Sequence, residues 1–391
     1  MKNNKSIETN AIRNHLERSQ FQEHSTPLYL SSSFVFQDAG SMADAFEENT
    51  TNTNIYSRFS NPNTSEFVQK IAAMEGAEDG YAFATGMAAI FSTFAALLQS
   101  GDHVLSARNV FGSTHTLFTK YLPKWQINTD YFDIDKPDTI ADLIQPTTKI
   151  IYAETPTNPG VDVLDLEHLG KIARAHQVLL IIDNCFATPY IQQPLRYGAD
   201  LVVHSATKLI DGQGRVLGGV VVGKKTLIAD IYAFSRNSGP ALSPFNAWIL
   251  SKSLETLAVR VEKHCDNALK LAQYLEEHPK IARVKYPFLP THPQYAVARK
   301  QMTLGGTIVA VELKGGLASG RRFLDAIKMC SLTANLGDAK TIVTHPASTT
   351  HSKLDKQELS ASGISPGLVR ISVGLEHITD IIQDIDQALY S

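Results

Sequence analysis

The chain has 391 residues, of which 43% are hydrophobic and 19% are charged, as is usual for a globular protein with more than one core. Its 36 lysines and arginines nearly balance 39 aspartates and glutamates, and there is no basic run of the kind that binds nucleic acid. No apolar stretch reaches the roughly 20 residues of a membrane span, and the N-terminal segment lacks the apolar centre of a secretory signal. The three cysteines are scattered, which fits a reducing compartment. We therefore expect a cytoplasmic protein without nucleic-acid or membrane partners.

The chain divides into three parts by pattern. Residues 1–63 are rich in Ser, Thr and Asn and predict an extended arm with one short helix near residues 12–18. Residues 64–255 then alternate between helical and strand patterns; the strand candidates are HVLSA, TDYF, KIIYAE, VLLIID and LVVHS, and the helical candidates include SEFVQKIAAMEG, GMAAIFSTFAALLQSGD and LEHLGKIARAHQ. This alternation predicts βαβ units and a mostly parallel sheet.

In the C-terminal third, a long helical stretch is followed by a second set of strand and helix candidates. Residues 242–278 form a long helical stretch with Pro244 in its first turn, which predicts one bent helix or two joined helices. Three strand candidates and two helices follow, in the segments ARVKYP, TIVAVEL, LVRISVG, GLASGRRFLDAIK and HITDIIQDIDQALY. We expect a smaller α/β domain over residues 256–391.

Lys208 is the most informative residue, because it follows the apolar run LVVHS within SATKLIDGQG. A buried lysine is costly unless its charge is lost or used, and an amine among hydroxyls and glycines suits covalent capture of an aldehyde cofactor. Ser205 and Thr207 suit a phosphate, and Asp183, at the end of VLLIID, suits a pyridinium nitrogen. Pyridoxal 5′-phosphate (PLP) requires this combination. Glu154 ends another strand candidate, so it belongs at the same sheet edge.

Five segments appear in a fixed order that resembles the Cys/Met-metabolism family of PLP enzymes, over about residue 25 to the end: YSRFSNPNT, ETPTNPG, DNCFATP, HSATKLIDGQG and LVRISVGLE. The resemblance implies an α/β fold like that of aspartate aminotransferase, known as PLP fold type I. Within the family, HSATKLIDGQGRVLGG and ANLGDAKTIVTHPASTTH look most like the O-succinylhomoserine sulfhydrylases.

The resemblance also implies roles for individual residues. Lys208 would bind the cofactor covalently and move protons, Asp183 would hold the pyridinium nitrogen, and Phe111 would stack on the ring. The remaining cofactor ligands would be backbone N–H groups of Gly86 and Met87 at a helix start, the hydroxyls of Ser205 and Thr207, and, from a neighbouring subunit, Tyr56 and Arg58. Substrate would be bound by Asn158, Arg370 and Asn335. The resemblance also implies a homo-oligomer, namely a homotetramer.

Two positions separate this chain from other members of the family that it resembles. Many members have tyrosine where this chain has Phe111, so no ring hydroxyl is available here for acid–base chemistry. Methionine γ-lyases have a cysteine where this chain has Ser113, which argues against that activity. His345, His351 and Asp338 match no tight helical ligand pair, so no metal site is predicted.

The implied reaction is PLP-dependent γ-replacement on O-succinyl-L-homoserine with sulfide, which yields homocysteine and succinate in methionine biosynthesis. Three alternatives stay open: cystathionine γ-synthase, O-acetylhomoserine sulfhydrylase, and a non-catalytic protein that has kept the fold. The intact set of Lys208, Asp183 and Arg370 argues against the last of these.

Overall fold

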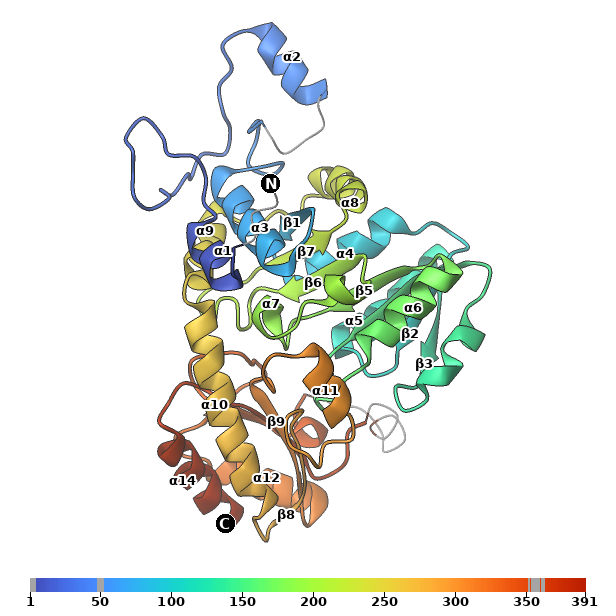
Figure 1. Ribbon diagram of the computed structural model, residues 1–391, viewed down its shortest axis with the longest axis vertical. Helices are drawn as coiled ribbons and strands as arrows, with labels where there is room; N and C mark the ends of the chain where they lie inside the picture. Colours follow the sequence, from blue (N-terminus) through green and yellow to red (C-terminus); the bar gives the residue numbers. More distant parts are fainter. Residues whose placement is uncertain (1–4, 48–52, 351, 353–358, 360–362) are drawn as a thin grey trace.

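The computed structural model describes residues 5–47, 53–350, 352, 359 and 363–391. A seven-stranded sheet in the order β1-β7-β6-β5-β4-β2-β3 forms the centre of the molecule (Figure 1). Its strands are β1 (Asp79–Phe83), β2 (His103–Ala107), β3 (Asn128–Phe132), β4 (Thr148–Glu154), β5 (Leu179–Asp183), β6 (Leu201–Ser205) and β7 (Gly219–Gly223). Only β7 runs against its neighbours β1 and β6 within this sheet. The predicted mostly parallel sheet is confirmed, although β1 and β7 were not foreseen as strands.

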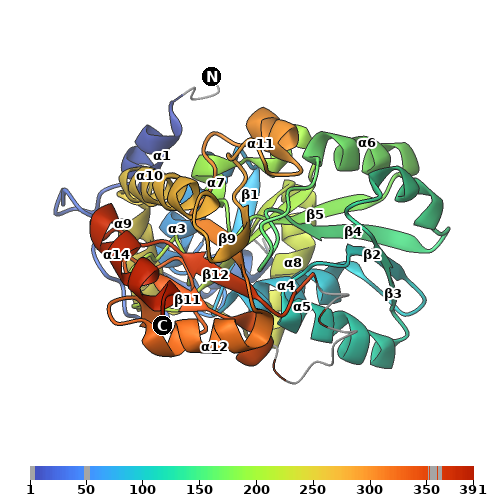
Figure 2. The same cartoon turned by 90° about the horizontal axis from the view of Figure 1, so that it is seen from below.

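Helices cover both faces of this sheet (Figure 2). On one side α4 packs against α8, and on the other α3 packs against α7. The helices of this part are α3 (Pro62–Glu75), α4 (Gly86–Leu97), α5 (Gly112–Thr116), α6 (Leu166–His176), α7 (Thr188–Ile191), α8 (Lys225–Ser238) and α9 (Pro244–Leu254). Strands β4, β5 and β6 are almost entirely buried between these layers, as is usual for a parallel sheet covered on both faces.

A second, smaller sheet has the strand order β10-β11-β12-β9-β8. Its strands are β8 (Ile281–Lys285), β9 (Ile308–Leu313), β10 (Ser331–Leu332), β11 (Ile342–Thr344) and β12 (Leu368–Ser372), and its helices are α11 (Tyr295–Gln301), α12 (Gly316–Ala326) and α14 (Ile378–Leu389). The predicted smaller α/β unit is confirmed, whereas β10, β11 and α11 were not foreseen.

The long helix α10 (Leu257–Glu276) joins the two sheets (Figure 1). Its first turns, at Leu257 and Val261, belong to the core of the large sheet, and its last turns, at Leu271 and Leu275, belong to the core of the small sheet. Of the two alternatives predicted for residues 242–278, two joined helices are present, because α9 ends at Leu254 and α10 begins at Leu257. A domain boundary at residue 255 remains a prediction, since α10 contributes to both cores.

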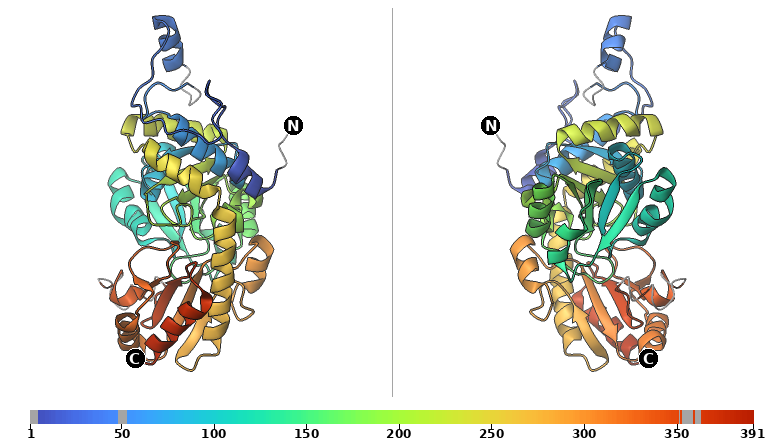
Figure 3. Two further views of the ribbon diagram at one scale, coloured as in Figure 1. Left: turned by 90° about the vertical axis from the view of Figure 1, so that its left-hand side faces the viewer. Right: turned by 90° about the vertical axis from the view of Figure 1, so that its right-hand side faces the viewer.

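The N-terminal arm projects α2 (Ala39–Glu47) away from the body (Figure 3). The helix expected near residues 12–18 is wrong in position: α1 spans Ile7–Arg13. The Ser6 side chain accepts a hydrogen bond from the Thr9 N–H and starts the helix, and the backbone at Asn14 is extended and ends it. The helix α2 was not predicted, and Met42 on it is exposed.

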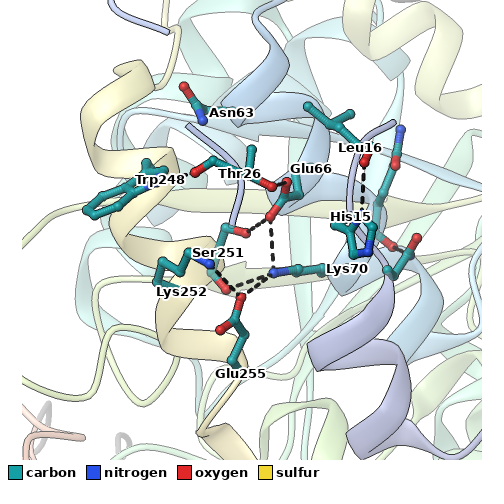
Figure 4. A network of polar contacts seen from close by, with 12 residues as sticks. His15, Leu16, Thr26, Asn63, Glu66, Lys70, Trp248, Ser251, Lys252 and Glu255 are labelled. Carbon is teal, nitrogen blue, oxygen red and sulfur yellow. Dashed lines mark hydrogen bonds and ion pairs between the residues drawn. The ribbon is translucent and has the colours of Figure 1, made fainter. Parts of the chain in front are cut away.

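A polar network, termed here the arm anchor, attaches Thr26 of the arm to the body (Figure 4). The Thr26 hydroxyl donates to Glu66 on α3, and the Thr26 carbonyl accepts from the Trp248 indole N–H at 3.0 Å. Behind Glu66 lies the buried ammonium of Lys70, 3.1 Å from both the Glu66 and Glu255 carboxylates. The arm is therefore attached to its own protomer through buried charges.

None of the helices within the described ranges combines the length and the apolarity that a membrane span requires.

Candidate active site

A cavity of about 280 Å³ lies where the carboxyl ends of β4, β5 and β6 face the small sheet. Parallel α/β sheets place ligand sites at this edge. Strand ends, the loops that follow them, the N-terminal half of α4 and Arg370 on β12 form the lining. Most of the predicted site is among the lining residues, which are Thr85, Gly86, Met87, Ile90, Phe111, Glu154, Asn158, Pro159, Asp183, Cys185, Phe186, Ser205, Thr207, Lys208, Leu217, Ala334, Leu336, Pro346, Thr350 and Arg370.

Lys208 lies in the turn after β6 and lines the cavity. The Nζ atom donates a hydrogen bond to Oδ1 of Asn335 at 2.5 Å. Burial lowers the pKa of Lys208, and the positive charge of Arg370 lowers it further. A lowered pKa increases the fraction of neutral amine, which is the form that attacks an aldehyde.

Asp183 is the last residue of β5 and is oriented by two hydrogen bonds. Oδ1 accepts from the Cys185 backbone N–H at 3.0 Å, and Oδ2 accepts from the Tyr152 hydroxyl at 3.3 Å. Burial raises the pKa of Asp183. A buried carboxylate with so few donors gains strongly from a cationic partner, and a protonated pyridine nitrogen is such a partner.

The opposite end of the cavity suits a phosphate. Helix α4 begins at Gly86, so the N–H groups of its first turn are open to a ligand, apart from the Ala88 N–H, which donates to the Thr85 hydroxyl at 3.0 Å. A side chain at residue 86 would come within 2.7 Å of the Ser205 Cβ, so only glycine lets this helix start approach the end of β6. These N–H groups and the Ser205 hydroxyl lie on one wall of the cavity.

Thr207 lies beside this wall but is partly engaged elsewhere. Its hydroxyl accepts from the Gly218 N–H at 3.1 Å and is 3.3 Å from the Gly218 carbonyl. These contacts join the Lys208 turn to the start of β7. The donor set as a whole fits PLP: an amine, a carboxylate for the ring nitrogen, and a helix start with hydroxyls for the phosphate.

Arg370 on β12 supplies a buried cation to the cavity. Its Nη1 donates to Oδ1 of Asn158 at 2.9 Å, and its Nη2 donates to the backbone carbonyl of Asn335 at 2.9 Å. Burial lowers the pKa of Arg370 to about 10, and its Nε is buried without a partner. Within the described ranges no carboxylate forms an ion pair with this guanidinium. A substrate carboxylate would supply the missing anion.

Three predicted residues do not line the cavity. Asn335 contacts both Lys208 and Arg370 from just outside it. Tyr56 and Arg58 lie in the arm, where Arg58 donates to the Arg236 carbonyl on α8 and its guanidinium lies over the Tyr56 ring. Neither is among the residues that line the cavity with Lys208, and their expected contact with a neighbouring subunit remains a prediction.

Sequence reasoning missed or discounted other residues of the site. Glu154 was placed at the sheet edge without a role, yet it is fully engaged there: it accepts from the backbone N–H groups of Phe111 and Asn158. Burial and the neighbouring Asp183 raise its pKa well above the usual value. Thr85 was not noticed, although threonine directly before a helical glycine is a recognisable cap signal. Cys185, one of the three scattered cysteines, received no role from the sequence and also lines the cavity.

Two histidines were considered as metal ligands in the sequence and rejected. Both ring nitrogens of His345 are hydrogen-bonded, Nδ1 with the Ser348 hydroxyl and Nε2 with the Pro366 carbonyl. His351 lies outside the described residues.

Residues 8–390 match the family described as Cys/Met metabolism PLP-dependent enzyme. The chain belongs to this family. Its cofactor is therefore PLP, and its fold is PLP fold type I, as expected from the sequence.

Relatives with two different activities are nearly equally similar to this family member. The O-succinylhomoserine sulfhydrylase of Pseudomonas aeruginosa is 44% identical over 383 residues, which cover 98% of this chain and 95% of that protein. The L-methionine gamma-lyase of Fusobacterium nucleatum subsp. polymorphum is 42% identical over 368 residues, which cover 93% and 92%.

A solved structure agrees with the fold and the cofactor of this family member. It is a putative O-acetylhomoserine (thiol)-lyase from Campylobacter jejuni, with a TM-score of 0.95 and 35% identity over 99% of this chain and 100% of that one. That crystal structure contains N′-pyridoxyl-lysine-5′-monophosphate, that is, a cofactor joined to a lysine.

Proposed function

We propose that this enzyme catalyses γ-replacement on O-succinyl-L-homoserine, in which sulfide displaces succinate and L-homocysteine is formed. The observation that carries the amino-acid part of the proposal is the buried Arg370 guanidinium, held by Asn158 and by the Asn335 backbone at the wall of the cavity that contains Lys208. An unpaired guanidinium in this position binds the α-carboxylate and orients the substrate.

The residues of the chain divide the chemistry among them. PLP supplies the electron sink that makes the substrate α-proton removable. Lys208 removes and returns protons, since burial favours its neutral amine and Asn335 holds its position. Asp183 would hold the ring nitrogen protonated, and the α4 N-terminus with Ser205 and Thr207 would bind the phosphate. Phe111 would lie beside the cofactor ring and offers no hydroxyl.

The choice of reaction within the family has separate support. The likeness to O-succinylhomoserine sulfhydrylases covers nearly the whole chain, but the likeness to methionine γ-lyases is almost as strong. Ser113 favours the sulfhydrylase, because the family resemblance of the sequence implies a cysteine at that position in methionine γ-lyases. Cystathionine γ-synthase and O-acetylhomoserine sulfhydrylase share the same machinery and differ in the thiol and in the ester.

We also propose that the active unit is a homo-oligomer, in the simplest case a tetramer. Tyr56 and Arg58 would bind the cofactor phosphate of a neighbouring subunit. Both residues belong to the N-terminal arm and are absent from the lining of the cavity of their own chain, which supports this arrangement.

The deciding experiment compares kcat/KM for four reactions of the purified holoenzyme. These are O-succinyl-homoserine with sulfide, the same ester with cysteine, O-acetyl-homoserine with sulfide, and methionine alone. We expect the first to exceed each of the others at least tenfold. A preference for cysteine would assign cystathionine γ-synthase, a preference for the acetyl ester would assign the O-acetylhomoserine enzyme, and release of methanethiol from methionine at the highest rate would assign the γ-lyase.

A further inference from the structure

Glu154 is a buried carboxylate that the proposed reaction does not use directly. It is the last residue of β4, is 3% exposed, and pairs in register with Asp183 on β5. Two carboxylates side by side in a buried sheet edge repel each other, and each is costly to desolvate. Within the described ranges neither forms an ion pair within the chain. A structural reason must offset this cost.

The two oxygens of Glu154 connect two separate loops. Oε2 accepts the backbone N–H of Phe111, the residue that precedes α5, at 2.9 Å. Oε1 accepts the backbone N–H of Asn158, four residues further along the chain, at 3.0 Å. Only a carboxylate of this length offers two acceptor oxygens to two donors, because a glutamine has one acceptor oxygen and would turn an NH₂ group toward the other N–H.

Both loops carry groups that face the ligand. The Phe111 ring is 43% exposed and lines the cavity. The Asn158 side chain accepts from Nη1 of Arg370, a contact between residues 212 positions apart. Burial is the largest influence on the pKa of both Glu154 and Arg370 and favours their neutral forms, whereas the charge of each group shifts the pKa of the other toward its charged form. Glu154 thus holds the backbone of Phe111 directly and is connected to the Arg370 guanidinium through one intervening residue, Asn158.

We propose that Glu154 is a positioning residue that holds the Phe111 ring and the Asn158–Arg370 pair at a fixed separation, and that it thereby sets the preference for ligands with a free α-carboxylate. This inference rests on the proposed role of Arg370. It predicts that loss of one acceptor oxygen releases one of the two loops, so the guanidinium is less well oriented for a carboxylate.

The test is a spectroscopic titration of the holoenzyme with L-norleucine, which has no leaving group, and with L-norleucinamide, which lacks the carboxylate. Ligand binding is followed as a change in the visible absorbance of the cofactor, so turnover is not needed. In Glu154→Gln we expect the Kd for norleucine to rise at least tenfold and the Kd for the amide to change less than threefold. An equal loss for acid and amide, or no loss for either, would contradict the proposal.

Asp384→Asn is the matched control. Asp384 is also a buried carboxylate whose oxygens accept backbone N–H groups, those of Lys328, Met329 and Cys330, but it lies on α14 in the small-sheet core. We expect it to change neither Kd. If it lowered the ratio of acid to amide affinity as much as Glu154→Gln does, the effect would be general loosening and the proposal would be wrong.

Two further variants distinguish a failure of the proposed Arg370 role from a failure of the proposed Glu154 role. Arg370→Ala should abolish the preference for the acid, and if it does not, the proposed carboxylate role of Arg370 fails rather than the role of Glu154. Should Glu154→Gln not accumulate as folded holoenzyme, Glu154→Asp decides the matter. Its carboxylate is withdrawn by one methylene group from both N–H donors, so the preference for the acid should fall, and an unchanged preference would contradict the proposal.

Discussion

Lys208 donates a hydrogen bond from its Nζ to Oδ1 of Asn335 at 2.5 Å, across 127 residues of sequence. The carbonyl of the same asparagine accepts from Nη2 of Arg370. One residue between the two sheets therefore holds both the amine that would bind the cofactor and the cation that would bind the substrate. The Lys208 amine and the Arg370 guanidinium therefore belong to one site, although Lys208 follows a strand of the large sheet and Arg370 lies on a strand of the small sheet.

Replacement of Lys208 by alanine should abolish turnover, since no other described amine lines the cavity. The visible absorbance of the lysine-bound cofactor should disappear, because alanine cannot form that bond. Absorbance spectra and rates of the purified variant check both points. Normal turnover in this variant would refute the assignment of Lys208.

Asp183→Asn should keep some cofactor but lose the charge that holds the ring nitrogen protonated. We expect kcat/KM to fall by a factor of at least 10², about 3 kcal/mol of transition-state stabilisation. The measurement is kcat/KM at saturating PLP, so that weaker cofactor binding is not counted as slower chemistry. A fall of less than tenfold would mean that Asp183 is not the partner of the ring nitrogen.

The proposed contact of Arg58 with a neighbouring subunit can be tested by mixing inactive protomers. Arg58→Ala should weaken PLP retention, because a guanidinium on the dianionic phosphate is lost. Hybrids of Arg58→Ala with Lys208→Ala should recover part of the activity, since one of the two sites in a hybrid dimer then has both residues intact. Verified hybrids without any recovered activity would count against a shared site.

Lys70→Met should lower the free energy of unfolding by about 3 kcal/mol or more, because it leaves the buried Glu66 carboxylate of the arm anchor with too little compensation. Denaturant unfolding at saturating PLP measures this. Lys171→Met, which breaks an exposed ion pair with Glu167, is the control and should cost less than about 1 kcal/mol. Equal costs would show that the anchor is not an internal ion pair in solution.

The stability of the protein should fall in mildly acidic solution partly because of His264. Its ring is buried on α10 with Nδ1 donating to the Val373 carbonyl, and burial lowers its pKa to about 4. The unfolded chain, with a histidine pKa of about 6.5, binds the extra proton first, so the contribution is fully present above pH 6.5 and is lost as the pH falls toward 4.

The His264→Gln variant, whose side chain can still donate to the Val373 carbonyl, should therefore lose less stability as the pH falls. We expect the wild type to lose up to about 1.4 kcal/mol more per pH unit than the variant between pH 6 and pH 4.5. Denaturant unfolding at several pH values measures the two slopes, and the exposed His176→Gln serves as control. Identical slopes for wild type and His264→Gln would contradict the expected titration.

The sequence by itself determined the parts that depend on local pattern. Apolar runs of strand length, separated by helical periods, led to the parallel strands β4, β5 and β6, and the polar residues that end them, Asp183 and Ser205, lie at the cavity as predicted. The family resemblance added Gly86 and Met87 at the start of α4. These signals are readable because a strand end or a helix start is encoded within a few neighbouring residues.

Only the tertiary structure decided which distant residues meet. Nothing local to Glu154 indicates that its two oxygens hold the loops of Phe111 and Asn158, and nothing local to Asn335 indicates that it joins Lys208 to Arg370. The physical reason is that a hydrogen bond depends on positions within a few tenths of an ångström, and those positions result from the packing of two sheets against each other rather than from any one segment.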